Sequence, residues 1–96
     1  MFKTCWLIKI TLQVLRDRKV DAVIISTPTF THEGLVDKAL EAGKAVFCEK
    51  PLAETVEATR RLYAKADKAK KPLLVAFNRR FDPSFRDAYD RVRAGT

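Results

Sequence analysis

Apolar residues in the middle of the chain gather in three short runs, each about as long as a buried strand. The runs lie within Val20–Ile25, Lys44–Cys48 and Leu73–Phe77. A nearly continuous apolar run, rich in β-branched side chains as the first one is, favours a strand that is covered on both faces. The pattern therefore predicts three strands.

Two segments between these runs carry apolar residues at helical spacing. The first helix is predicted to begin after Thr31, which can cap it, and to end before Gly43, which suits the position just beyond a helix. The second opens at Thr55 and ends at Pro72. Each helix would connect one strand to the next.

A third helix is predicted near the C-terminal end of the chain. Asp82 is a suitable N-cap, Pro83 suits the first helical position, and the helix extends to about Ala94. Its apolar stripe consists of Phe85, Ala88, Tyr89 and Val92.

The first 19 residues fit two patterns. Alternating apolar residues up to Val14 suggest a strand, whereas Trp6, Ile10 and Val14 have helical spacing. We expect a helix at about Thr11–Arg18. We treat Met1–Ile10 as a leader of uncertain structure.

The order of the predicted elements is strand, helix, strand, helix, strand, helix. Strands that alternate with helices imply crossover connections and a parallel sheet. The predicted fold class is therefore α/β, with a partial doubly wound, Rossmann-like sheet of about three parallel strands and flanking helices. Residues 11–96 would form this partial domain.

The chain has 96 residues, which suits one small domain, and a net charge of +7. The excess is concentrated in Arg60–Arg93, which holds eleven basic residues and four acidic ones. Such a segment invites a nucleic-acid or anionic-ligand hypothesis. We favour a solvated helix face, because no aromatic side chain interrupts Lys65–Lys71.

Two cysteines and one histidine are too few for a disulfide framework or a metal site, so no metal is expected. Cys48 is expected to pack as a small apolar residue. Unpaired cysteines suit a reducing compartment and suggest a cytoplasmic protein. The apolar opening of the chain is interrupted by Lys3 and Lys9, is too short for a membrane span and lacks a secretory cleavage site. We therefore expect no membrane partner.

Polar residues follow each predicted strand. The sequences are STPTFTH after the first strand, CEKP at the end of the second and NRRF after the third. In an open parallel sheet, ligands bind beyond the carboxyl ends of the strands. We therefore expect these three segments to line one crevice.

Lys50 is the strongest candidate for chemistry in this crevice. Its amine could exchange a proton with a substrate hydroxyl or polarise a carbonyl. Glu49 could orient Lys50, and Pro51 would fix the backbone between them and the next helix. Spacing alone, however, favours a solvated Glu–Lys pair in a turn.

The other polar residues at the strand ends have both a functional and a structural interpretation. His32 could move a proton, although a lone histidine in the first turn of a helix is more often a surface residue. Ser26 and Thr27 could bind a ligand or only satisfy the strand end. Arg79 and Arg80 could hold an anion or form a solvated pair.

Together, these segments resemble a known enzyme family. In chain order they read VDAVIISTPTFTHEGLVDKALEAGKAVFCEKPLAET and VAFNRRFDPSFRDAYDRVRAG. They are similar to the family of glucose–fructose oxidoreductase and inositol 2-dehydrogenase, and the RRFD piece is most similar to the inositol dehydrogenase branch. The resemblance covers about residues 12–96 and rests on the order and spacing of Thr-Pro, His, Ala-Gly-Lys, Glu-Lys-Pro and Arg-Arg-Phe.

The resemblance implies a function. Members of the family use NAD or NADP to oxidise or reduce sugars, cyclitols and related polyols. It implies that Lys50 is a catalytic residue near the nicotinamide and the reacting hydroxyl, and that the Lys50–Pro51 peptide bond is cis. The cofactor-binding positions that it implies are Thr27, Pro28, Glu49, Lys50, Asn78 and Arg79.

Parts of the family pattern have no counterpart in these 96 residues. None of Gly34, Gly43 and Gly95 can supply the Gly-x-Gly-x-x-Gly turn that brings a helix N-terminus to the pyrophosphate. The acidic residue for the adenosine ribose and the C-terminal substrate domain are absent as well. We therefore expect the later half of a dinucleotide-binding domain, which alone binds NAD weakly or not at all and turns over no polyol.

Three functional hypotheses follow. The first is a part of an NAD(P)-dependent oxidoreductase that acts on a sugar, cyclitol or related polyol. The second is a non-enzymatic interaction module that self-associates through the exposed edge of the first strand, unless Met1–Ile10 covers it. The third and least favoured is a basic nucleic-acid-binding domain that uses Arg60–Arg93.

Overall fold

The computed structural model describes residues 11–95 of the chain. Residues 11–16 are helical. The elements that follow are β1 (Ala22–Ile25), η1 (Thr29–Thr31), α2 (His32–Glu41), β2 (Ala45–Glu49), α3 (Val56–Ala69), β3 (Leu73–Ala76), η2 (Asn78–Phe81) and α4 (Pro83–Ala94), where η denotes a short 3₁₀ helix.

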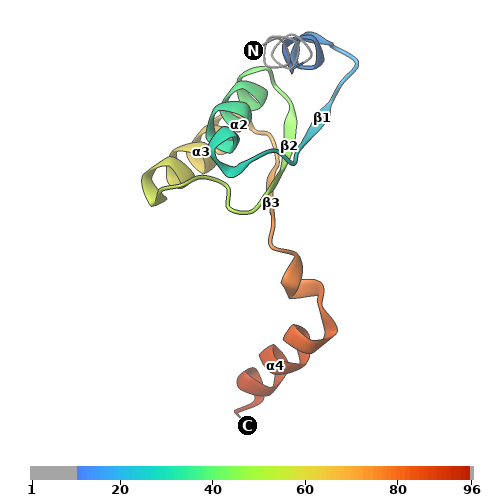
Figure 1. The fold of residues 1–96 in the computed structure, drawn as a ribbon, viewed down its shortest axis with the longest axis vertical. Helices are drawn as coiled ribbons and strands as arrows, with labels where there is room; N and C mark the ends of the chain where they lie inside the picture. Colours follow the sequence, from blue (N-terminus) through green and yellow to red (C-terminus); the bar gives the residue numbers. More distant parts are fainter. Residues whose placement is uncertain (1–10, 96) are drawn as a thin grey trace.

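The three strands form one parallel sheet with β2 in the middle (Figure 1). The register places Cys48 of β2 between Ile25 of β1 and Val75 of β3. Three parallel strands joined by helices confirm the predicted α/β class. Because the strands are parallel, their three carboxyl ends lie at the same edge of the sheet.

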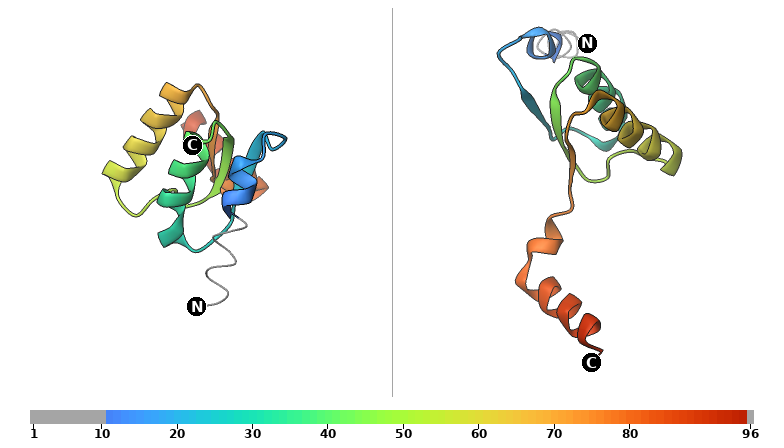
Figure 2. Two further views of the ribbon diagram at one scale, coloured as in Figure 1. Left: turned by 90° about the horizontal axis from the view of Figure 1, so that it is seen from above. Right: turned by 180° about the vertical axis from the view of Figure 1, so that it is seen from behind.

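Helices α2 and α3 cover one face of this sheet (Figures 1 and 2). The strand residues that point to this face alternate with those that point away from it. The core between the helices and the sheet consists mainly of Ile25, Val46, Cys48 and Val75 from the strands and Val36, Leu40, Leu62 and Ala66 from the helices.

The predicted ends of the helices are largely confirmed. The Thr55 hydroxyl accepts a hydrogen bond from the backbone N–H of Ala58 at 3.1 Å, and the Asp82 carboxylate accepts one from Ser84 at 2.8 Å. Gly43, just beyond α2, has a φ of +77°, which a residue with a side chain adopts only at a cost. These local contacts explain where α3 and α4 begin and where α2 ends.

Thr31 departs from its predicted role. It is the N-cap residue of α2 by position, but its side chain makes no capping hydrogen bond to the helix. Its hydroxyl donates instead to the carbonyl of Pro28 at 2.6 Å and lies 2.6 Å from the hydroxyl of Thr27. Thr31 therefore closes the loop after β1.

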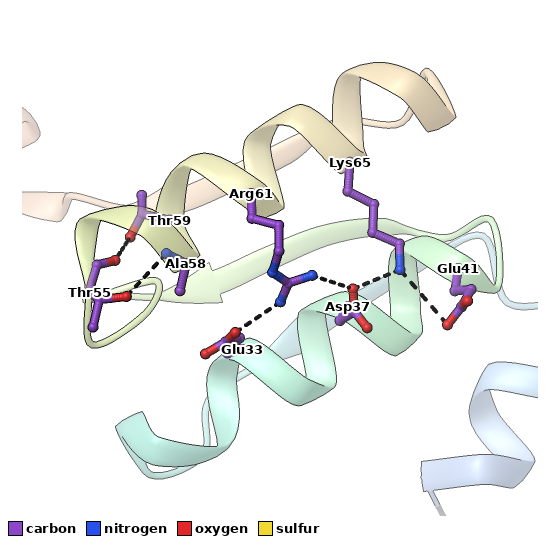
Figure 3. A network of polar contacts seen from close by, with 8 residues as sticks. All are labelled: Glu33, Asp37, Glu41, Thr55, Ala58, Thr59, Arg61 and Lys65. Atoms are coloured by element: carbon purple, nitrogen blue, oxygen red, sulfur yellow. Dashed lines mark hydrogen bonds and ion pairs between the residues drawn. The ribbon is translucent and has the colours of Figure 1, made fainter.

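Ion pairs join α2 to α3 on their outer side (Figure 3). The Asp37 carboxylate accepts hydrogen bonds from Lys65 at 2.7 Å and from Arg61 at 3.1 Å, and Arg61 also pairs with Glu33 at 2.9 Å. The hydrogen bond from Lys65, opposed by partial burial and supported by Arg61, holds the pKa of Asp37 below its usual value. This network fixes how the two helices lie side by side.

The opposite face of the sheet differs from the sequence-based expectation. The continuous apolar run at β1 predicts a strand covered on both faces, yet the Ile24 side chain is 77% exposed. Ile24 lies in register with Phe47, and Phe47 with Leu74, which is 56% exposed. Within residues 11–95, no helix covers this row. The expectation that both faces are covered fails because α2 and α3 both lie on the first face. A further element would be needed to cover the second face.

Helix α4 projects away from the sheet and its two helices (Figures 1 and 2). None of its 12 residues is buried. The radius of gyration of 16.3 Å exceeds the ~12.5 Å expected for a compact domain of this length. The predicted apolar stripe of this helix therefore exists but has no partner within residues 11–95.

The helical segment at 11–16 confirms part of the helix expected over Thr11–Arg18. Leu15 packs against the core, and the buried Lys44 donates from Nζ to the carbonyl of Asp17 at 2.7 Å. This bond ties the end of the first helical segment to the start of β2. The assignment of Met1–Ile10 lies outside the described residues.

Residues 11–95 contain no helix that is long and apolar enough to cross a membrane. Across the same residues, the His, Cys, Asp and Glu side chains form no group of three or more that could hold a metal ion. Every buried side-chain nitrogen or oxygen in this range has a hydrogen-bond partner.

Candidate functional site

The segments predicted to form a site follow the carboxyl ends of the three strands. Thr27 comes two residues after β1, Lys50 directly after β2, and Asn78 two residues after β3. The parallel register brings all three ends to one edge of the sheet. This edge is the place at which open α/β sheets bind ligands.

Three of the predicted residues line the same hollows at this edge. Lys50, Asn78 and Arg79 border a cavity of about 280 Å³ that Phe77 and Arg80 also line. The same three residues border a neighbouring, wider cavity of about 570 Å³. The structure thus gathers an amine, an amide and a guanidinium, all hydrogen-bond donors, around open space.

Thr27 lies in a different environment. It lines an apolar cavity of about 190 Å³ between the 11–16 segment, β1 and α2, and it is not among the residues around the Lys50 cavities. Pro28 is exposed in the same loop. Within residues 11–95, the expected single crevice is therefore divided, with the end of β1 apart from the ends of β2 and β3.

His32 connects the loop after β1 with the loop after β2, and the sequence does not indicate this connection. Its Nδ1 lies 2.7 Å from the carbonyl oxygen of Pro51, and its Nε2 lies 2.8 Å from that of Thr27. The side chain is 1% exposed, so the prediction of a surface residue is wrong, and the proton-transfer role has no route to solvent or substrate. Because a carbonyl oxygen only accepts, the ring nitrogen that carries the proton donates to the carbonyl that it faces.

A signal for this burial is present in the sequence. His32, Val36 and Leu40 are spaced by four residues, which places them on one face of a helix. Val36 and Leu40 are core residues, so His32 lies on the same buried face. Extending the apolar stripe of the predicted helix by one turn toward the N-terminus would have indicated that His32 is buried.

The Glu49–Pro51 segment has the backbone that the resemblance implies. The Lys50–Pro51 peptide bond is cis. Glu49 is the last residue of β2, is half-buried, and is in register with Ala76 of β3. Lys50 follows with an exposed side chain. The carbonyl of Pro51 is then held by His32, so the segment is fixed on both sides of Lys50.

The arginines after β3 stack on aromatic rings. The guanidinium carbon of Arg79 lies 5.1 Å from the ring centre of Phe85, and that of Arg80 lies 5.2 Å from the ring centre of Phe81. Both arginines are exposed. A guanidinium over a ring keeps its edge N–H groups available for an anion. The two interpretations, anion binding and a solvated pair, both remain compatible with this geometry.

Cys48 packs in the core, as predicted. Its side chain is 0% exposed, and its Sγ donates weakly to the carbonyl of Glu49 at 3.3 Å. Burial, with a further contribution from the negative charge of Glu49, raises the pKa of the Cys48 thiol to about 11. The thiol is therefore neutral at physiological pH, and it is a poor nucleophile despite lying next to the candidate site.

Comparison with known proteins identifies the family of this chain. A family model described as an oxidoreductase family with an NAD-binding Rossmann fold matches residues 8–77. The chain is 47% identical over 79 residues to an inositol 2-dehydrogenase of Rhizobium meliloti, covering 79% of this chain and 24% of the relative. It is 45% identical over 83 residues to a scyllo-inositol 2-dehydrogenase (NAD(+)) of Bacillus subtilis, covering 86% and 24%.

Solved structures agree with this relationship. An NAD-binding protein from Listeria innocua superposes with a TM-score of 0.84 at 40% identity, covering 88% of this chain and 24% of that chain. An apo scyllo-inositol dehydrogenase from Lactobacillus casei superposes with a TM-score of 0.76 at 34% identity, covering 88% and 26%. The chain thus spans about a quarter of the length of the proteins that it matches.

Proposed function

The chain belongs to the oxidoreductase family with an NAD-binding Rossmann fold, and on that premise we propose that its strand-end edge is the nicotinamide side of an NAD(P) site in a cyclitol dehydrogenase. The observation that carries the proposal is the cavity lined by Lys50, Asn78 and Arg79 at the ends of β2 and β3. This cavity adjoins the cis Lys50–Pro51 bond that the family resemblance implies.

The described residues fit one half of the cofactor. Lys50, Asn78 and Arg79 present donors to an open cavity, which suits an amide and the nearby ribose. The pyrophosphate lacks such a fit within residues 11–95, because Gly34 lies inside α2 and Gly43 and Gly95 follow α2 and α4. No glycine turn here brings a helix N-terminus to a phosphate.

Lys50 is the residue to which we assign the proton transfer. When bound, NAD(P) accepts or returns the hydride. Oxidation of a substrate hydroxyl also releases a proton, and the amine of Lys50 can take it up, or its ammonium can return it in the reverse direction. Glu49 and the carbonyl contact of His32 at Pro51 would hold Lys50 in position. Thr27 and Pro28, at the end of β1, would border the site from outside the Lys50 cavities.

The substrate class that we propose is a cyclitol. It is suggested by the relatives named inositol 2-dehydrogenase and scyllo-inositol 2-dehydrogenase, to which the chain is 47% and 45% identical. Uncharged polyols are bound through hydroxyl donors and acceptors. The cluster of donors at the carboxyl edge is compatible with such a substrate.

A chimera tests the assignment of Lys50. We would replace the matched segment of the Bacillus subtilis scyllo-inositol 2-dehydrogenase with residues 12–95 of this chain and follow NADH formation with scyllo-inositol. Lys50→Ala is expected to lower kcat by roughly 10²–10⁴-fold, the usual contribution of a general acid–base group. Lys38→Ala, an exposed lysine of α2, is the matched control and should leave kcat unchanged. An active chimera that tolerates Lys50→Ala would remove Lys50 from the mechanism.

We propose that the 96-residue chain alone binds NAD weakly and has no dehydrogenase activity. The chain spans about a quarter of its relatives, and the pyrophosphate contacts have no counterpart within residues 11–95. Calorimetric titration with NAD should therefore give no measurable heat up to millimolar concentrations. Binding in the micromolar range would contradict this proposal, since it would require phosphate contacts that these residues do not offer.

A second candidate function is an interaction module. β1 is an outer strand of the sheet, and the exposed side chain of Ile24 adds apolar surface beside its edge. An open strand edge can pair with a strand of another chain. A proline substitution in β1, Val23→Pro, would abolish such pairing, although the same change would also disturb the core contact of Val23.

A further inference from the structure

Within residues 11–95, two apolar surfaces are covered by no other helix or strand, and they differ in kind. The first, which we call the open sheet face, consists of Ile24, Phe47 and Leu74 in one row across the three strands. The second, which we call the C-terminal stripe, consists of Phe81, Phe85, Tyr89 and Val92 along η2 and α4. Within the described residues, this sheet face therefore has no covering helix, and the helix has no covering sheet.

The C-terminal stripe has the pattern of a helix that packs on a flat surface. Phe85, Tyr89 and Val92 are spaced by four and three residues and lie on one side of α4. Their exposed fractions are 48%, 52% and 76%. Other positions of the helix carry ion pairs that suit solvent, with Arg86 bound to Asp90 at 3.3 Å and Arg91 bound to Asp87 at 2.8 Å. The large apolar side chains of α4 therefore lie on one side of the helix. There the guanidinium groups of Arg79, Arg86 and Arg93 stack on the rings of Phe85 and Tyr89.

The dimensions of the two surfaces match. A helix of 12 residues is about 18 Å long. The outer strands of a three-stranded sheet lie about 10 Å apart, so such a helix crosses all three with its stripe over the central row. The open sheet face is therefore wide enough to accommodate one α4.

The connection to α4 directs it away from its own sheet. Between β3 and α4, the chain forms η2, in which Asp82 N–H donates to the carbonyl of Arg79 at 3.0 Å. The Arg79 guanidinium stacks on Phe85 in the first turn of α4 and so links η2 to the helix. These contacts hold α4 beyond the carboxyl edge of the sheet, as both Figures 1 and 2 show.

We propose that two copies of this chain form a reciprocal dimer in which the C-terminal stripe of each copy covers the open sheet face of the other. The contact is self-complementary, because each copy supplies both surfaces and a two-fold axis satisfies both at once. The proposal does not rest on the dehydrogenase function, since it uses neither Lys50 nor the strand-end cavities.

The area is sufficient for a stable dimer. Each copy contributes seven large, substantially exposed apolar side chains on the two surfaces. Burying them in both contacts removes roughly 1,200–1,600 Å² from water, which lies within the range of specific protein–protein interfaces. The net charge of +7 on each copy opposes association, so added salt is expected to strengthen the dimer.

The oligomeric state of the full 96-residue chain is the first measurement. Sedimentation or light scattering over a wide concentration range should show a monomer–dimer equilibrium whose dissociation constant falls as the salt concentration rises. A chain that stays monomeric at all concentrations overturns the proposal, and folding of α4 onto its own sheet would give that result.

Two charge variants then test which surfaces meet. Leu74→Glu alters the open sheet face and Val92→Glu alters the C-terminal stripe, and each should weaken its homodimer at least roughly tenfold by burying unpaired carboxylates. Ala64→Glu adds the same charge at an exposed position of α3 and should have little effect. Circular dichroism checks the fold, and Ile24→Glu replaces Leu74→Glu if that variant unfolds.

Mixing the two variants identifies the reciprocal contact. In a mixed dimer, the unmodified stripe of one copy meets the unmodified sheet face of the other, so one complete contact returns and association should recover toward the wild-type level. Packing of sheet on sheet would leave Val92→Glu without effect, and packing of stripe on stripe would leave Leu74→Glu without effect. Either result, or a mixture no stronger than the two variants alone, overturns the proposal.

Discussion

At the scale of single residues, buried polar groups decide how the strand-end loops are placed. His32 accounts for much of this, because one imidazole contacts the carbonyls of Thr27 and Pro51 from inside the core. Removing one partner of a buried polar contact costs more than the contact contributes, since the remaining groups lose both water and partner. The loop that carries Lys50 therefore depends on a side chain that itself lies outside the candidate site.

Replacing His32 tests this dependence. His32→Ala should lower the free energy of unfolding by about 2–4 kcal/mol, because it removes the contacts of the imidazole with the two carbonyls and leaves a cavity in place of the ring. Urea unfolding followed by circular dichroism measures the change. Phe30→Ala, two residues away at an exposed position, is the control and should stay within about 0.5 kcal/mol of wild type. Equal stabilities for the two variants would show that His32 is dispensable.

The buried thiol of Cys48 gives a second prediction at this scale. In a Cys5→Ser background, alkylation of Cys48 at pH 8 should be on the order of 100-fold slower than in urea, because labelling requires unfolding. The pKa of this thiol is raised from 9.0 to about 11. Its contribution to stability is therefore fully present below pH 9 and is lost as the pH rises through 11. Rapid labelling of the native protein would contradict the burial.

At the scale of elements, helix ends follow local sequence, while the pairing of helices follows charges that are far apart in the chain. Thr55 and Asp82 begin their helices with their own side chains. By contrast, Asp37 finds Lys65 and Arg61 only once α2 and α3 lie side by side. The ion pairs therefore report on tertiary structure.

Replacing Asp37 measures the strength of this helix–helix contact. Asp37→Asn should lower the free energy of unfolding by about 0.5–1 kcal/mol, since the network is partly exposed to solvent. Asp87→Asn, which removes a more exposed pair with Arg91 within α4, is the matched control and should cost at most about 0.5 kcal/mol.

The effect of Asp37 should also depend on pH. Its folded-state pKa is lowered, chiefly by the hydrogen bond from Lys65, so its contribution is present above the ordinary pKa of an aspartate and is lost as the pH falls through the lowered value. Wild type and Asp37→Asn should therefore converge in stability in acid. A difference that persists unchanged at low pH would exclude an ionic origin.

At the scale of the whole molecule, helices cover one face of the sheet, and the other face is exposed within residues 11–95. α2 and α3 complete the first face, whereas the second face and the projecting α4 each lack a partner within residues 11–95. Stability should consequently be uneven along the chain, since it follows buried apolar contacts.

Hydrogen exchange tests this unevenness. In dilute solution, the amides of β2 should exchange most slowly among the described strands, because β2 is paired on both sides, and those of α4 should exchange faster than those of α3. At concentrations that favour the proposed dimer, the α4 amides should slow while those of the 11–16 segment do not. Slow exchange of α4 at every concentration would mean that the helix is already covered in the monomer.

The sequence by itself determined the parts of this protein that depend on neighbours along the chain. Three apolar runs, two side-chain caps and the glycine after α2 set the elements and their order, because strand and helix periodicity and capping are local properties. The order of the elements then implied a parallel sheet. The family resemblance around Glu49-Lys50-Pro51 implied the cis peptide bond that the structure contains.

Only the tertiary structure decided which surfaces are covered and which residues meet. It placed His32 in the core, where the sequence suggested a surface residue, and it separated Thr27 from the cavity of Lys50, where the sequence suggested one crevice. It also left Ile24 and α4 exposed, although their apolar patterns suggested burial. The physical reason is that an apolar run specifies a need for burial without naming what buries it. The covering element comes from another part of the fold, which the local pattern cannot specify.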